Sequence, residues 1–244
     1  MNWVLPVVLV SVLIVISLVL ILVEKLLGGG GEKVITINDE TKIPVKGDDT
    51  VLNTLSSEKI FIPSACGGKA TCGLCKFKLV GGDGHLKPTE EPFISDEERE
   101  EGVRLSCQVK VKSDMKILLP KGLLNAKEYK TVVSYVEDLT YDIKLVRFKL
   151  IEPKEIDFKP GQYVQIQVPG IEVIRAYSIA SDPKQKNEIE LIIRLVPNGQ
   201  ATTFVHKAME VGDKIIITGP YGDFFLREDS NKDMICIAGG SGKA

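Results

Sequence analysis

The sequence predicts a multidomain α+β protein: an N-terminal transmembrane helix, a mostly β domain with one packed helix, a β-barrel, and the start of an α/β domain. An uncharged apolar run opens the 244-residue chain, and a group of cysteines then lies between alternating β patterns. A train of short strands separated by Gly and Pro follows. The net charge of -2, with acidic and basic residues interspersed, gives no electrostatic footprint for nucleic acid.

Residues 1–27 are predicted to form a membrane anchor. The stretch 4–23 carries no charge, and its length matches the roughly 20 residues that cross a bilayer. A cleaved signal peptide is the alternative, but it requires a basic start, a shorter apolar core and a small-residue cleavage site. Lys25 and Lys33 follow the run, which predicts a single pass of the inner (plasma) membrane with the soluble domains in the cytoplasm. The glycine-rich residues 28–32 predict a flexible tether.

Residues 33–121 are predicted to form the first soluble domain. The segments VITIND and TKIPVKG read as a β-hairpin, and DDTVLNTLSSEKI reads as a helix opened by an Asp cap. CKFKLVGG reads as a strand, and ISDEEREEGV as a short helix capped by Ser95 with a Glu three residues later. QVKVKSDMKILLP supplies a final alternating strand.

Four cysteines in this domain indicate a metal centre. They have the spacing C-x5-C-x2-C with a distant fourth member: Cys66, Cys72, Cys75 and Cys107. Four thiolates are what a [2Fe–2S] cluster requires, and the spacing is one residue longer than the plant-type C-x4-C-x2-C. A four-thiolate zinc site is the alternative, although structural zinc sites usually join two closely spaced ligand pairs. ACGGKATCGLC and RLSCQV resemble the ferredoxin family, which implies a β-grasp fold.

Residues 127–229 are predicted to form a Greek-key β-barrel that binds a flavin. Its segment RAYS resembles the RxYS motif of the ferredoxin-NADP+ reductase superfamily. That resemblance implies that Arg175 pairs with the flavin diphosphate, that Tyr177 packs against the isoalloxazine ring, and that Ser178 lies near the reactive ring nitrogen. Tyr177 and Ser178 are therefore the candidate catalytic residues.

Three neighbouring segments extend this resemblance. PGQYVQI is similar to the family's PGQ(Y/F) strand, and GPYGDFFL to the stretch that closes its barrel. GQATTFVH is similar to its Gly-x-x-Ser/Thr turn, which implies that Gly199 and Thr202 hold the diphosphate at a helix N-terminus. FAD is the expected cofactor, and FMN remains an alternative.

Residues 230–244 read as the beginning of a nicotinamide-binding domain. AGGSGKA resembles the family's glycine-rich turn, which implies that Gly239 and Gly240 lie beside the pyrophosphate of NADH. Because a dinucleotide-binding βαβ array needs roughly another hundred residues, we expect the chain to be truncated and not competent to oxidise NADH by itself.

The order of these parts resembles the F subunits of the sodium-translocating NADH:quinone reductases. The resemblance implies an enzyme that relays electrons from NADH through FAD to the [2Fe–2S] cluster, together with other membrane subunits of a quinone-reductase complex. One departure is that Val168 leads to Arg175 without that family's long insertion. Two other functions stay open: the reductase component of an oxygenase, and a non-enzymatic anchored electron-transfer module.

Overall fold

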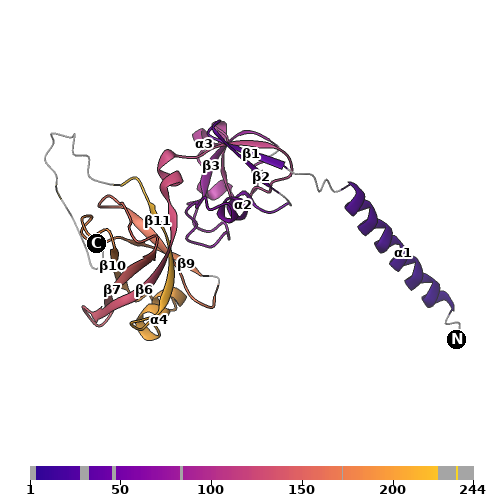
Figure 1. Ribbon diagram of the computed structural model, residues 1–244. Coiled ribbons are helices and arrows are strands. Elements are labelled where there is room, and N and C mark those ends of the chain that lie inside the picture. Colours follow the sequence, from indigo (N-terminus) through magenta and orange to yellow (C-terminus); the bar gives the residue numbers. More distant parts are fainter. Residues whose placement is uncertain are drawn as a thin grey trace.

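Two β-sheets with their own helices make up most of the protein (Figure 1). The computed structural model describes residues 4–27, 33–45, 48–82, 85–171, 173–224 and 235. The elements up to residue 125 are α1 (Val4–Leu27), β1 (Lys33–Ile37), β2 (Thr41–Val45), α2 (Val51–Ser57), β3 (Lys76–Gly81), η1 (Glu91–Phe93), α3 (Asp96–Glu100), β4 (Val103–Leu105), β5 (Met115–Leu118) and η2 (Lys121–Asn125). The remaining elements are β6 (Lys127–Asp138), β7 (Ile143–Glu152), β8 (Tyr163–Gln167), β9 (Ile174–Ser178), β10 (Glu188–Arg194), α4 (Gln200–Lys207) and β11 (Lys214–Tyr221).

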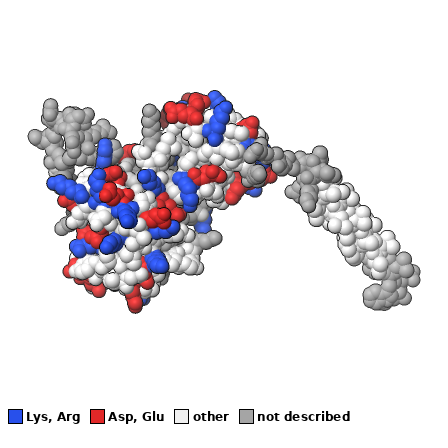
Figure 2. All heavy atoms as spheres, viewed as in Figure 1, with Lys and Arg blue, Asp and Glu red and all other residues white. Residues whose placement is uncertain are grey.

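The N-terminal helix α1 has 24 residues. Its described side chains carry no charge and are white in Figure 2, whereas Lys, Arg, Asp and Glu are mixed over the visible face of the two β domains. Among the described residues, no helix satisfies both the length and the hydropathy that a membrane crossing requires. The single membrane pass therefore stays a prediction.

The first sheet has the strand order β2-β1-β5-β3-β4. Strands β1 and β5 pair in parallel at its centre, and the other pairs are antiparallel. Helix α2 contributes Val51, Leu52 and Leu55 to the core that this sheet covers. The predicted hairpin and the strand that follows the cysteine loop are both confirmed.

Two local predictions for this domain need correction. The cap of α2 is Thr50, whose side chain accepts a hydrogen bond from the Asn53 amide, and it is not an Asp. The Asp49 carboxylate instead accepts hydrogen bonds from the Thr50 amide and from Asn53 Nδ2. The last predicted strand is also shorter, since only Met115–Leu118 joins the sheet. The amide of Val111 donates to the Asp49 carbonyl instead, which holds that stretch at the start of α2. The capping box of α3, formed by Ser95 and Glu98, is as predicted.

The second sheet has the strand order β10-β7-β6-β11-β8-β9. Strands β6 and β7 form a hairpin, while β11 returns from far along the chain to pair with β6, as in a Greek key. An isolated bridge between Ile179 and Leu191 joins the two ends of the sheet into a barrel. The core includes Phe148 and Ile189, neither of which is exposed. The predicted train of short strands and the helix N-terminus at Gly199 are confirmed.

The predicted nicotinamide-binding segment cannot be placed. Gly239 and Gly240 lie outside the described residues, as does all of 230–244 except Ile235.

Candidate functional site

The structure brings the four predicted cysteines together as two pairs of sulfurs. In the outer pair, Cys66 and Cys72 are half-buried and their Sγ atoms are 3.4 Å apart. In the inner pair, Cys75 and Cys107 are 1% and 5% exposed and interact through their side chains. A single tetrahedral zinc needs four ligands around one point, whereas a [2Fe–2S] cluster places two thiolates on each iron. The paired arrangement therefore fits the binuclear cluster. No group of three or more metal-binding side chains around a single ion was found in the described part of the chain.

The loop that carries the outer pair depends on glycine. Gly68 and Gly73 have φ angles of +84° and +67°, in the left-handed region that L side chains rarely adopt. A Cβ at Gly73 would also lie 2.6 Å from Cδ1 of Phe93. The Gly68 amide donates to the Ser64 hydroxyl at 3.0 Å. These contacts hold the loop closely around the position that a cluster would occupy.

Each sulfur pair contains one cysteine that ionises readily. The hydrogen bond between the inner thiols lowers the pKa of Cys107 to about 6, and that same contact together with burial raises the pKa of Cys75. Burial acts to raise the pKa of Cys66, but hydrogen bonds led by the Thr71 amide lower it to about 7. Burial raises the pKa of Cys72. Because the thiolate is the form that binds metal, each pair contains one cysteine that can readily bind a metal ion.

A buried ion pair fixes the turn that carries the fourth cysteine. Glu90 is fully buried and accepts hydrogen bonds from Arg104 Nε at 3.1 Å and from the Leu105 amide at 2.8 Å. The Lys87 amide donates to the same carboxylate at 3.0 Å. Sequence reasoning missed Glu90, because nothing in the run PTEEPF distinguishes it from its acidic neighbour.

The three predicted flavin residues of β9 lie on an edge of the barrel sheet. Arg175 and Ser178 are exposed, and Ser178 is opposite Tyr163 of β8. The Tyr177 ring is largely buried, which raises the pKa of its phenol to about 12. Its hydroxyl has no hydrogen-bond partner within the described residues. The Tyr177 hydroxyl can therefore still form a hydrogen bond with a bound ring.

The helix turn predicted to hold the diphosphate has the expected close backbone approach. Gly199 is the N-cap of α4, and a Cβ on it would lie 2.6 Å from Thr202 Oγ1. The Thr202 hydroxyl accepts from the Val196 amide at 3.1 Å and is buried in the turn. In this structure that hydroxyl closes the turn, and its predicted contact with phosphate stays a prediction.

The two sites meet where the two β domains touch. Arg175 Nη1 donates to the carbonyl of Ala65, the residue before Cys66, at 3.0 Å. The Ser64 amide donates to Gln165 Oε1 of β8 at 3.3 Å. A cavity of about 310 Å³ has walls formed by Cys66 and Cys72 on one side and by Arg175 on the other. The cysteine loop and Arg175 thus share one pocket.

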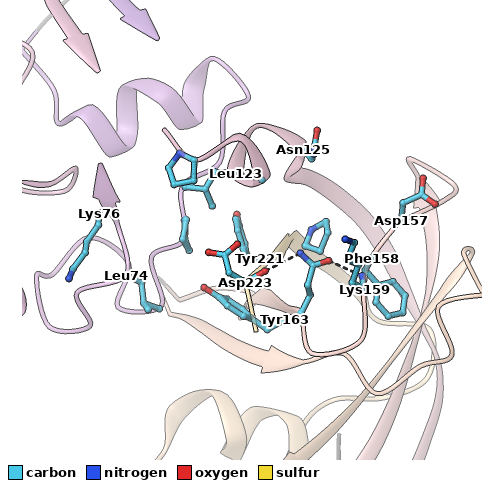
Figure 3. Close-up of a pocket in the computed structure, with 16 residues that line it drawn as sticks. Leu74, Lys76, Leu123, Asn125, Asp157, Phe158, Lys159, Tyr163, Tyr221 and Asp223 are labelled. Carbon is cyan, nitrogen blue, oxygen red and sulfur yellow. Dashed lines mark hydrogen bonds between the residues drawn. The ribbon is translucent and has the colours of Figure 1, made fainter. Parts of the chain in front are cut away.

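A larger cavity of about 790 Å³ lies at the same domain boundary (Figure 3). Leu74 comes from the cysteine loop, Leu123 from η2, and Tyr163 and Tyr221 from the barrel. The two tyrosine rings are tilted by 39° with centroids 5.6 Å apart. Burial raises the pKa of Tyr163 to about 12, and the charge of Cys72 adds to this rise.

Two family models match the chain. Residues 35–112 match the model described as 2Fe-2S iron-sulfur cluster binding domain, and residues 130–226 match the one described as oxidoreductase FAD-binding domain. The first range contains all four cysteines, and the second contains Arg175, Tyr177 and Ser178.

Curated relatives match nearly the whole chain. The F subunit of the Na(+)-translocating NADH-quinone reductase of Neisseria gonorrhoeae is 33% identical over 286 residues, which cover 100% of this chain and 70% of that protein. The protein of the same name in Actinobacillus succinogenes is 33% identical, with 96% of this chain and 67% of that protein covered.

Solved structures of reductases also resemble the chain. The Amycolatopsis cytochrome P450 reductase GcoB has a TM-score of 0.62 at 28% identity, and the match covers 82% of this chain and 61% of that one. The ferredoxin reductase in carbazole 1,9a-dioxygenase has a TM-score of 0.61 at 27% identity, with 87% and 68% covered. In both cases the coverage exceeds what either β domain could give by itself.

Proposed function

The chain belongs to the family formed by the F subunits of Na(+)-translocating NADH-quinone reductases, and on that premise we propose that it passes electrons from NADH through FAD to a [2Fe–2S] cluster. It is an oxidoreductase with an iron–sulfur domain and a flavin domain. The observation that carries the proposal is the shared pocket in which Cys66 and Cys72 face Arg175. Electrons then continue to the membrane subunits of a quinone-reductase complex.

The proposed roles of the cysteines follow from their pairing. Cys66 and Cys72 hold the iron nearer the barrel, and Cys75 and Cys107 hold the buried iron. Bound FAD would accept two electrons from a hydride donor and pass them on one at a time, and this chemistry belongs to the cofactor. The chain keeps the two cofactors close, because Cys66 and Cys72 share a pocket with Arg175.

The barrel residues bind and orient the flavin in this proposal. Arg175 holds the diphosphate with the guanidinium nitrogens that do not contact Ala65, since a guanidinium offers five donors. Tyr177 lies against the ring, and exposed Ser178 donates near its reactive nitrogen. Thr202 offers its backbone amide in the first turn of α4 to phosphate, and Gly199 permits the close approach while its own amide donates to the Val196 carbonyl at 2.9 Å. Gly239 and Gly240 bind the pyrophosphate of NADH.

We further propose that residues 1–27 anchor the protein in the inner membrane by a single pass, with the β domains in the cytoplasm. The support is the uncharged run 4–23 and the lysines that follow it. Deleting residues 1–27 should move the protein from the membrane pellet to the supernatant after ultracentrifugation. Continued sedimentation of the shortened protein with membranes would contradict the anchor.

A second function is favoured by specific observations. The two proteins with similar structures are a cytochrome P450 reductase and the ferredoxin reductase in carbazole 1,9a-dioxygenase. In this chain only six residues separate Val168 from Arg175. The alternative is therefore the reductase component of an oxygenase. The predicted anchor argues against it, and reduction of a purified oxygenase by this protein at a rate above that with quinone would establish it.

The decisive experiment measures both cofactors in anaerobically purified protein. We expect a flavin absorbance band and about one EPR-active [2Fe–2S] cluster per chain after reduction with dithionite. Arg175→Ala should weaken flavin binding by about 1.5–3 kcal/mol, the size of a hydrogen bond to a charged group. Arg194→Ala, which removes an exposed Arg paired with Asp142, is the matched control. Colourless protein without iron would contradict the proposed function.

A further inference from the structure

The fourth cysteine is flanked by two polar side chains that no role described so far explains. Ser106 is 0% exposed, and its hydroxyl has no hydrogen-bond partner among the described residues. Gln108 is half-buried, and its Nε2 lies 3.6 Å from Cys107 Sγ. Buried hydroxyl groups in proteins are nearly always hydrogen-bonded, because an unpaired one destabilises the fold. The Ser106 hydroxyl therefore indicates an acceptor that only the loaded site provides.

Backbone hydrogen bonds place Ser106 beside the inner sulfur pair. Its amide donates to the Cys75 carbonyl at 2.8 Å, and its carbonyl accepts from the Leu52 amide at 3.1 Å. The residue is thus held between β3 and α2. Ser106 is therefore bonded through its amide to Cys75 and is the residue before Cys107. Its buried hydroxyl lies beside the two predicted ligands of the buried iron.

Gln108 is held in place from the other side of Cys107. Thr89 Oγ1 donates to Gln108 Oε1 at 3.0 Å, which fixes the amide with its NH₂ group toward the cysteine. The same NH₂ group also lies 3.3 Å from the Cys107 carbonyl. Lys87 Nζ donates to the backbone carbonyl of Gln108. The orientation of this amide therefore results from contacts outside the cysteine loop.

We propose that Ser106 and Gln108 donate hydrogen bonds to the thiolates of Cys75 and Cys107 and thereby raise the midpoint potential of the cluster. The inference rests on the proposed function, because it requires the cluster to be bound. Reduction adds a negative charge to the cluster, so donors that face its sulfurs stabilise the reduced form more than the oxidised form. Side chains around a metal centre tune its potential in this way without being ligands.

The outer pair offers a contrast within one cluster. The Cys66 sulfur receives its hydrogen bonds mainly from loop residues such as Thr71 and Lys69. Gln108 Nε2 contacts the Cys107 sulfur, and the Ser106 amide is bonded to the Cys75 carbonyl. Both side chains therefore lie beside the inner pair, so the proposal predicts a change in the Fe–S vibrations as well as in the potential.

The test compares Ser106→Ala and Gln108→Leu with the wild-type chain carrying FAD and iron. The matched control is Ser57→Ala, which removes an exposed hydroxyl of the same domain that donates to the Asn53 carbonyl. Iron content is measured first, then the midpoint potential by EPR-monitored titration, and then the Fe–S stretching frequencies by resonance Raman in H₂O and D₂O.

Each of the two variants should lower the equilibrium constant for one-electron reduction about three- to tenfold, the size expected of one hydrogen bond. A tenfold change corresponds to about 59 mV for one electron. The D₂O shift of the Fe–S frequencies should become smaller, and Ser57→Ala should change neither quantity.

Other outcomes separate the inference from the proposed function. Wild-type protein without iron would contradict the proposed function itself. Full iron content with unchanged potentials in both variants would overturn the inference and leave the proposed function intact. If Ser106→Ala binds no iron, half-buried Gln108 decides the matter, and an unchanged potential in Gln108→Leu overturns the inference.

Discussion

In the cysteine domain the candidate site is enclosed, whereas in the barrel it lies along the edge strand β9. Cys75 and Cys107 are almost fully buried, and the loop, β4 and the Glu90–Arg104 pair hold them from several sides. Arg175 and Ser178 are exposed, and the contact that Arg175 makes beyond its own strand is with Ala65 of the other domain.

This difference separates what each domain does for its cofactor. The cysteine domain positions its ligands by its own packing and backbone hydrogen bonds, so we expect it to assemble a cluster without flavin. The barrel site is completed by a neighbour, because the cysteine loop supplies one wall of the pocket that contains Arg175. Flavin placement should therefore depend on both domains.

Replacing one inner ligand gives the largest expected effect. Cys75→Ala should abolish the [2Fe–2S] EPR signal and the bound iron, since three thiolates leave one iron without its second protein ligand. The flavin content of the same variant should be unchanged, because Cys75 does not line the pocket shared with Arg175. An unaltered EPR spectrum would contradict the ligand assignment, and loss of flavin as well would show that the loop needs its cluster to form its wall of the pocket.

Breaking the buried ion pair should destabilise only the enclosed site. Glu90→Gln removes the charge that Arg104 contacts at 2.5 Å, with side chains 0% and 5% exposed. Removing one member of a buried pair typically destabilises a fold by about 3–5 kcal/mol. The measurement is urea denaturation followed by cluster absorbance for the cysteine domain and by flavin fluorescence for the barrel.

The control for this variant is an exposed pair of the same domain. Lys78 and Glu101 are 3.3 Å apart with side chains 40% and 64% exposed, so Glu101→Gln should change the free energy of unfolding by less than about 1 kcal/mol. Equal effects of the two variants would mean that burial does not decide the strength of these pairs.

The sequence was sufficient for features that rest on local patterns. The cysteine spacing identified the four sulfurs that the fold gathers, and the Ser95–Glu98 pattern predicted its capping box. The cap of α2 was mistaken because Asp49 and Thr50 are adjacent and both suit an N-cap. Their hydrogen bonds decide between them, and Asp49 is engaged with Asn53 Nδ2.

Contacts between distant segments could not be predicted. Arg175 and Ala65 are 110 positions apart, and no local pattern indicates that a predicted phosphate ligand also holds the cysteine loop. Glu90 looks like an ordinary solvated acid in sequence, and only the return of β4 beside it buries the carboxylate.

Removing the unpaired hydroxyl of Tyr177 tests the candidate site in the barrel. Tyr177→Phe deletes a buried hydroxyl that has no partner in the described chain. An unsatisfied buried group costs about 1–3 kcal/mol, so the flavin-free barrel should become more stable by about 1 kcal/mol in thermal denaturation. Weaker flavin binding by the same variant would show that the hydroxyl contacts the cofactor. A destabilised apo-barrel would contradict the absence of a partner.

The smallest effect concerns which sulfur pair reacts in cluster-free protein. The pKa of Cys66 is lowered to about 7 while the pKa of its half-buried neighbour Cys72 is raised. Because the thiolate is the reactive form, the rate of alkylation by iodoacetamide at Cys66 should be half-maximal near pH 7 and level off at higher pH. The inner cysteines should react more slowly, since burial limits their access even though the pKa of Cys107 is low. Peptide mass spectrometry after timed labelling between pH 5 and 9 measures the order. Faster labelling of Cys107 than of Cys66 would mean that the inner pair is open without metal, and that the enclosed site forms only when the cluster binds.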